Sequence, residues 1–174
     1  MMQSILDPVA HARLIRELLE VLRVANVPPQ FVHSSAKSYC SETELDWLTN
    51  FHEQREAGVA GLAMIGVEAP ENRCMAICGA LLRNFVDARL VPLNVLIDDP
   101  QAGMSASVLV IPNFYMRTYG KAIPAWKVQP IYDVLLARMT AVKPSVLFIE
   151  SLKDMEAQWG PGMASLIKNH YRVS

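Results

Sequence analysis

The chain has 174 residues, 52% of them hydrophobic and 19% charged, with a formal net charge of −1. This length favours one compact domain with a sizeable core, and the near-neutral charge gives no global basic signature for nucleic acid. No apolar stretch approaches the ~18 residues of a membrane span, and the start, MMQSILDPVAHARL, lacks the basic and apolar parts of a signal peptide, so we expect a cytoplasmic protein.

The first part of the chain carries helical patterns. Asp7-Pro8 indicates a helix start, because Asp caps a helix and Pro fits its first turn. The apolar residues that follow fall on one helical stripe: Ile15, Leu18, Leu19 and Leu22. We therefore predict a helix over 8–25, ended by an extended link at 26–31 that contains two prolines.

A further helix is predicted by a capping box, in which Ser41 and Glu44 stand three residues apart. Apolar residues then recur at helical spacing, at Leu45, Leu48 and Phe51. Gly58 closes this helix. Residues 1–58 are therefore predicted to form an N-terminal helical extension.

From residue 59 onward, short apolar runs alternate with helical stripes. The runs are nearly continuous, which is typical of strands buried on both faces. Strands are predicted at 59–66, 92–98, 107–112 and 144–150, with a small edge strand at 171–173. Helices are predicted at 74–85, 126–142, 153–158 and 162–169.

This alternation predicts an α/β domain over 59–174, with a parallel sheet that carries helices on both faces. The extension is expected to pack on it as part of one compact unit. Ligands of such sheets bind at the carboxyl ends of the strands. The segments that follow the predicted strands should therefore share one rim: 66–74, 98–105, 112–120 and 150–152.

Several segments stand in an order and spacing that point to one family: VPPQF (27–31), GLAMIG (61–66), SVLVIPNFY (107–115), 125–151 and 160–173. Over roughly 27–173 the chain resembles the AAA+ domain of the DnaC/IstB-like family, which comprises bacterial helicase loaders and the ATPase partners of certain transposases. The resemblance implies a three-layer P-loop NTPase-like (AAA+/RecA-like) fold. In that fold 61–66 leads into the Walker A loop, 107–115 carries Walker B and 144–150 ends at a sensor residue.

The Walker A position departs from the family pattern. A phosphate loop needs glycines whose backbone N–H groups wrap phosphate, a Lys for charge and a Ser/Thr for magnesium. In GVEAPENRC (66–74) only Gly66 survives. Without a gap, Asn72 falls at the Lys position and Arg73 at the Ser/Thr position. After a shift of one residue, Arg73 falls at the Lys position and Cys74 at the Ser/Thr position.

The other nucleotide-site positions are changed as well. The Walker B acids become Pro112 and Asn113, the sensor position becomes Glu150 or Ser151, and the Ser-Arg pair becomes Ser165-Leu166. Asn lacks the charge that holds magnesium. We therefore expect a pseudo-ATPase with no catalytic residue and no bound ATP or magnesium. The family's helix after the second strand is missing, so direct DNA binding is in doubt.

A protein partner is expected instead, either an AAA+ ATPase, a helicase or transposase-like protein, or a second copy of the chain. The stretch NFYMRTYGKAIPAW (113–126) is long for a connection, and long connections are often functional. We predict that Tyr115, Arg117 and Tyr119 are at least partly exposed and contact the partner. Trp126 is predicted to pack inward.

Other interpretations stay open at this point. A small enzyme or nucleotide-binding protein could reuse the rim through Asp98, Asp99, Asn113 and Glu150, since carboxylates serve acid/base chemistry or bind cations. A scaffold subunit of a machine unrelated to DNA would have the same sequence features. No metal site is expected: Cys74 and Cys78 share a helix face without a third ligand and are predicted to be core thiols.

Overall fold

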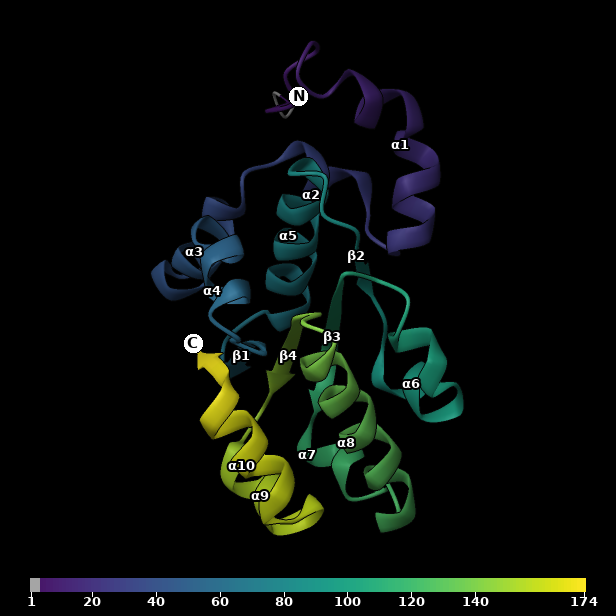
Figure 1. Cartoon of the computed structure of the whole chain (residues 1–174), viewed down its shortest axis with the longest axis vertical. Helices are drawn as coiled ribbons and strands as arrows, with labels where there is room; N and C mark the ends of the chain where they lie inside the picture. Colours follow the sequence, from purple (N-terminus) through teal and green to yellow (C-terminus); the bar gives the residue numbers. More distant parts are fainter. Residues whose placement is uncertain (1–3) are drawn as a thin grey trace.

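A computed structural model describes residues 4–174 of the chain. At its centre lies an all-parallel, five-stranded sheet with the order β2-β3-β4-β1-β5 (Figure 1). The strands are β1 Gly61–Ile65, β2 Ala88–Leu90, β3 Val108–Tyr115, β4 Ser145–Ile149 and β5 Tyr171–Val173. The predicted α/β class with a parallel sheet is therefore confirmed.

Helices cover both faces of the sheet (Figure 1). One face carries α1 Ala12–Ala25, α2 Pro29–His33, α3 Glu42–Thr49, α4 Phe51–Glu56 and α5 Pro70–Arg83, with the 3-10 turn η1 Ala36–Ser38. The other carries α6 Leu93–Asp98, α7 Arg117–Gly120, α8 Ala125–Thr140, α9 Leu152–Trp159 and α10 Pro161–His170, with the turn η2 Pro100–Gly103.

Two separate apolar clusters show why the layers form. Successive strand residues point to opposite faces. Thus Leu62 and Met64 join the cluster under α1–α5, whereas Ala63 joins the cluster under α6–α10. Phe31 and Trp47 of the N-terminal extension belong to the first cluster. The extension therefore packs against the sheet through the same core as α5.

The structure contains several of the elements that were predicted from local sequence patterns. The capping box of Ser41 and Glu44 is present, with both of its hydrogen bonds. Strands β1 and β4, the split between α9 and α10 at Gly160, and the edge strand β5 also match the predictions.

The second predicted strand is wrong. Residues 93–98 form helix α6, and the strand in that part of the chain is the short β2 at Ala88–Leu90. A helix therefore does follow the second strand, so the expectation that this helix is missing is also wrong. Leu93 and Leu96 are buried while Val95 is exposed, so the apolar residues of this segment follow a helical period rather than an alternation. Pro92 has an extended conformation and is the residue directly before α6, so the helix begins after it.

The N-terminal helices also differ in detail. Asp7 caps a turn by accepting from the backbone N–H groups of Val9 and Ala10, and α1 starts only at Ala12. Its buried face is Leu14, Leu22 and Ala25, so the predicted stripe is partly exposed. The 26–31 link contains the start of α2, and the predicted helix after Ser41 is divided at Asn50 into α3 and α4.

Helix α2 makes an unusually close backbone contact with α5. A Cβ atom on Gly79 would lie 2.2 Å from the Phe31 carbonyl oxygen, so only glycine fits there. Arg83, one turn further along α5, donates from Nη1 to the carbonyl oxygens of Phe31 and Val32 at 2.9 and 3.0 Å. Together these contacts fasten the extension to α5.

We predict that Gly79→Ala destabilises the protein by about 1–3 kcal/mol, because the new methyl group meets backbone rather than a movable side chain. Gly162→Ala is the matched control: it is also helical, and nothing lies within 4 Å of the position that its new methyl group would take. The control should be neutral or stabilising by up to about 1 kcal/mol. Urea unfolding of both variants measures the difference, and equal effects would contradict the close contact.

Candidate functional site

The turn between β1 and α5 is the segment that the resemblance compares with a Walker A loop. Gly66 adopts a left-handed conformation with φ of 62°, and its N–H donates to the Ile149 carbonyl oxygen at 2.9 Å. Ala69 is also left-handed, with φ of 48°, and α5 begins at Pro70. Asn72 and Arg73 therefore lie inside the helix, and the turn before it contains only residues 66–69.

Arg73 is held by groups of the chain itself. Its Nε donates to the Glu68 carbonyl oxygen at 2.9 Å, and its Nη1 lies 3.0 Å from Oε1 and 3.2 Å from Oε2 of Glu44. Glu44 is completely buried. A buried carboxylate is tolerated when it is paired and hydrogen-bonded, and Arg73 supplies the opposite charge.

Glu44 has further partners that join distant parts of the chain. Its Oε2 accepts from the Ser41 N–H at 2.8 Å, and its Oε1 accepts from the Ser174 hydroxyl at 2.9 Å. We call these four residues, Ser41, Glu44, Arg73 and Ser174, the Glu44 cluster. It links the start of α3, the start of α5 and the residue after β5. The capping motif signalled one role of Glu44, but its ion pair with a residue 29 positions away has no local signal.

Pro112 and Asn113, the residues that the resemblance compares with the Walker B acids, lie within strand β3 rather than at its end. Ile111 is opposite Leu147 and Tyr115 is opposite Ile149, so β3 has an irregular register between these pairs. Pro112 lies in this interval, which is where a strand tolerates a residue without an N–H. The Asn113 side chain accepts from the Leu93 N–H at 2.9 Å and thereby caps α6.

Glu150, which the resemblance compares with a sensor residue, belongs to an ion-pair network with Arg117 and Asp154. Glu150 Oε2 accepts from the Arg117 N–H at 2.7 Å, and the Arg117 Nε donates to Asp154 Oδ2 at 2.6 Å. The Ser151 hydroxyl and the Arg117 guanidinium lower the pKa of Asp154. Glu150 therefore fixes the turn after β3 to the end of β4.

Two of the aromatic predictions are wrong. Tyr115, expected to be exposed, is fully buried and packs edge-on against Trp159 at 5.2 Å between ring centroids. Trp126, expected to pack inward, is 71% exposed, with Lys127 Nζ 5.3 Å from its ring centre. The predicted exposure of Tyr119 (63%) and of the Arg117 side chain (59%) is confirmed.

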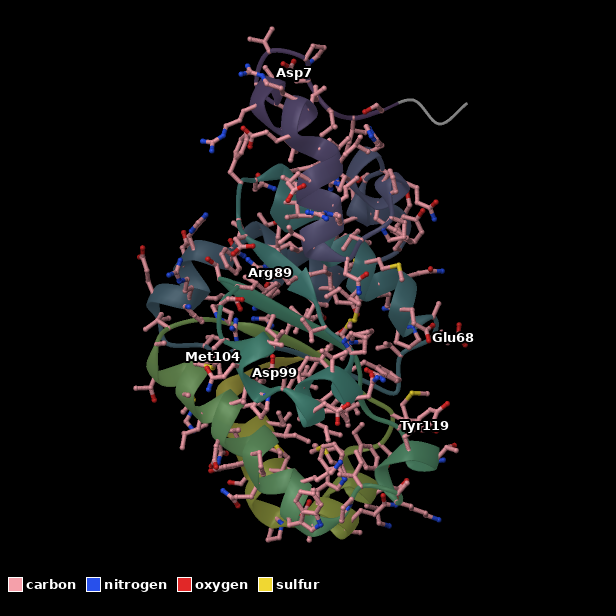
Figure 2. All side chains as sticks on the ribbon, turned by 90° about the vertical axis from the view of Figure 1, so that its right-hand side faces the viewer. Asp7, Glu68, Arg89, Asp99, Met104 and Tyr119 are labelled. Carbon is pink, nitrogen blue, oxygen red and sulfur yellow. The ribbon has the colours of Figure 1, made fainter. Side chains whose placement is uncertain are left out.

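One predicted part of the rim lies elsewhere. Residues 103–107 precede β3, so they lie at the amino ends of the strands, whereas Glu150 follows the carboxyl end of β4. In Figure 2, Glu68 and Tyr119 lie on one side of the molecule and Met104 on the other. Asp99 caps η2 by accepting from the Gln101 N–H at 3.0 Å. The set Asp98, Asp99, Asn113 and Glu150 is therefore not assembled into one site.

The guanidinium of Arg138 organises that opposite edge. It is fully buried and donates to the Ser145 hydroxyl and to the carbonyl oxygens of Gly103, Ala106, Ser107 and Pro144. Burial lowers the pKa of Arg138 to about 10. The link before β3 thus takes its shape from a side chain of α8.

The cysteines lie in the core as predicted. Cys74 and Cys78 are buried, and burial raises the pKa of both thiols. Burial, followed by the charge of Glu44, raises the pKa of Cys40 to about 12.

Among residues 4–174, no three His, Cys, Asp or Glu side chains are arranged to hold a metal ion. Within the same range, no helix has both the length and the apolar character needed to cross a bilayer.

No protein-family model matches the chain, and comparison with curated proteins gives no match either.

We predict that Glu44→Gln destabilises the protein by about 3 kcal/mol, because it leaves the partly buried Arg73 without its counter-charge. Gln keeps the size of the side chain and its capping role. The control is Glu156→Gln, which removes the exposed pair with Lys168 at 2.8 Å and should cost less than about 1 kcal/mol. Urea unfolding compares the two, and an equally small effect at Glu44 would contradict the structural role of the cluster.

Proposed function

We propose that this chain is a degenerate AAA+-like domain, a pseudo-ATPase that binds a protein partner in DNA replication, transposition or another mobile-element process. The observation that carries the proposal is the contact of Arg73 with Glu44. The single cationic side chain of the β1–α5 turn and the first helical turn is neutralised by a buried carboxylate, so its charge is not offered to a phosphate.

The sheet order supports the family part of this proposal. Strands β1, β4 and β3 are neighbours, and all three run parallel. The segments after them, at Gly66, Glu150 and Met116, therefore meet at one edge of the sheet. This is the edge at which the Walker A, sensor and Walker B positions of the resemblance have to meet to form one nucleotide site.

The chemistry at this edge favours binding over catalysis. Pro112 offers no N–H and no charge, and Asn113 caps α6. Glu150 is occupied by Arg117. A magnesium-nucleotide site needs a Lys, a hydroxyl ligand and acids directed at the metal, and these positions supply none of the three.

We predict that calorimetric titration with Mg-ATP or Mg-ADP shows no binding tighter than about 1 mM, which corresponds to roughly 4 kcal/mol. The protein's cooperative urea transition, recorded on the same preparation, serves as the control for folding. A saturable isotherm in the micromolar range would contradict the pseudo-ATPase proposal.

The partner surface proposed for this domain includes the exposed aromatics Tyr119 and Trp126, because interface energy concentrates in a few aromatic anchors. We predict that Tyr119→Ala with Trp126→Ala reduces recovery of a replication or transposition protein from the native host at least about tenfold, with little change in melting temperature. Leu136→Ala, also exposed and on α8, is the control. Unchanged recovery would remove these two residues from the partner surface, and an equal loss in the control would show that the effect is not local.

A further inference from the structure

A groove of about 330 Å³ lies between the N-terminal helices and the last turns of α5. Its lining residues come from the η1 turn, from α3 and α4, and from the end of α5 with the residues that follow it. Figure 1 shows α3 and α4 beside α5. The volume is at the lower end of the range of small-molecule pockets in proteins. We call this feature the α5 groove.

The interior of the α5 groove is apolar. Phe51 and Leu81 of its lining are buried, and Leu45, Leu48 and Val86 are half-buried. The three half-buried residues keep apolar surface in contact with water, and covering such surface is favourable. A ligand with an apolar body is therefore stabilised in this groove.

The charged residues of the lining are basic. Lys37 and Arg83 are cations, His52 adds an imidazole, and no acidic residue lines the groove. In the part of the chain that the structure describes, neither Lys37 nor Arg83 forms an ion pair. The groove therefore carries positive charge that no contact with a carboxylate neutralises.

Acidic residues of the neighbouring helices lie away from this lining. Asp46 of α3 and Glu53 of α4 line a different groove, beside β5, where Asp46 pairs with Arg172 at 2.9 Å. Glu44 of α3 is buried and pairs with Arg73. The positive charge of the α5 groove is thus left for a ligand.

Arg83 is the cation that most needs a counter-charge, because it is half-buried. Its Nη1 donates to the carbonyl oxygens of Phe31 and Val32, which accept hydrogen bonds but bring no formal negative charge. Burial lowers the pKa of Arg83, and no acidic side chain opposes this effect. A guanidinium in such a setting is stabilised when an anion pairs with it.

Two other arginines with buried guanidinium groups have the partners that Arg83 lacks. Arg73 pairs with the carboxylate of Glu44. Arg138 donates from all three of its nitrogens, to the Ser145 hydroxyl and to backbone carbonyl oxygens. Within residues 4–174, Arg83 donates from Nη1 alone, so its Nε and Nη2 remain as a side-by-side pair of donors.

We propose that the α5 groove binds a small amphipathic carboxylate, an organic anion that carries an apolar chain or ring. The carboxylate pairs with Nε and Nη2 of Arg83, because a guanidinium matches a carboxylate through two parallel hydrogen bonds, and Lys37 adds charge. The apolar body covers Leu45 and Leu48. This inference does not depend on the proposed pseudo-ATPase function, because no lining residue belongs to the segments after β1, β3 or β4.

Titration of the full chain with octanoate tests the proposal, because octanoate joins a carboxylate to an apolar chain. We expect saturable binding in the millimolar range or below, with changes in the amide NMR spectrum concentrated at 35–37, 45–52 and 80–86. Octanol has the chain without the charge, and acetate has the charge without the chain. Each should bind at least about tenfold more weakly than octanoate.

Two matched pairs of variants test the place of binding. Thr49→Asp puts an acid into the lining at an exposed position and should weaken octanoate binding at least about tenfold. Thr140→Asp is its control: both threonines are exposed, end a helix and donate to the carbonyl oxygen four residues earlier, but Thr140 does not line the groove. Lys37→Gln should weaken binding about two- to fivefold, and Lys153→Gln, also an exposed change, should leave it unchanged.

Melting temperatures close to that of the wild type verify that the four variants are folded. An octanoate titration without saturation overturns the proposal. Octanol that binds as tightly as octanoate overturns the role of charge, and acetate that binds as tightly overturns the role of the apolar interior. A Thr49→Asp variant that binds octanoate like the wild type, or a Thr140→Asp variant that loses as much affinity, overturns the assignment to this groove.

Discussion

The buried carboxylate of Glu44 is the interaction on which the arrangement of this molecule depends. It cannot be placed in the core without partners, because an unpaired buried charge is strongly unfavourable. Its partners come from three places: the start of α3, the start of α5 and the residue after β5. Satisfying one carboxylate therefore fixes the N-terminal extension, the turn between β1 and α5 and the edge of the sheet relative to one another.

The same requirement bears on the proposed loss of nucleotide chemistry. A cation that stabilises a buried acid cannot at the same time be the loosely held charge that meets an incoming phosphate. The carboxyl edge of the sheet repeats this pattern at Glu150, whose carboxylate accepts from the backbone of Arg117, and at Asn113, which caps α6. Polar groups at this edge are used to hold loops together, which is consistent with a domain that works as a binding module.

The sequence predicts the features whose causes are local. The Ser41–Glu44 cap and the strands β1 and β4 follow from neighbouring residues or from apolar runs buried on both faces. The prediction for the segment after Pro92 is wrong because a short apolar run fits a strand or a helix equally well. The aromatic predictions fail for a different reason. Tyr115 is buried because Gly120 leaves room for its ring and Trp159 covers it, and the contact with Trp159 cannot be read from the stretch around Tyr115. The pairing of Glu44 with Arg73 is likewise a property of the folded chain.

The buried guanidinium of Arg138 has a consequence for how the chain encodes its own shape. The link before β3 contains small residues, and its conformation is set by carbonyl oxygens that accept from a side chain more than thirty positions later in the chain. Carbonyl oxygens are the same in every residue type, so the conformation of this link depends strongly on Arg138 of α8. Met104, Ser105 and Ser107 can then be replaced without a change of backbone, whereas Gly103 cannot, because a Cβ atom there would lie 2.7 Å from Leu96 Cδ2. A single change at Arg138 alters the whole edge. A lysine would not serve, because one ammonium cannot direct donors to acceptors spread along two separate segments.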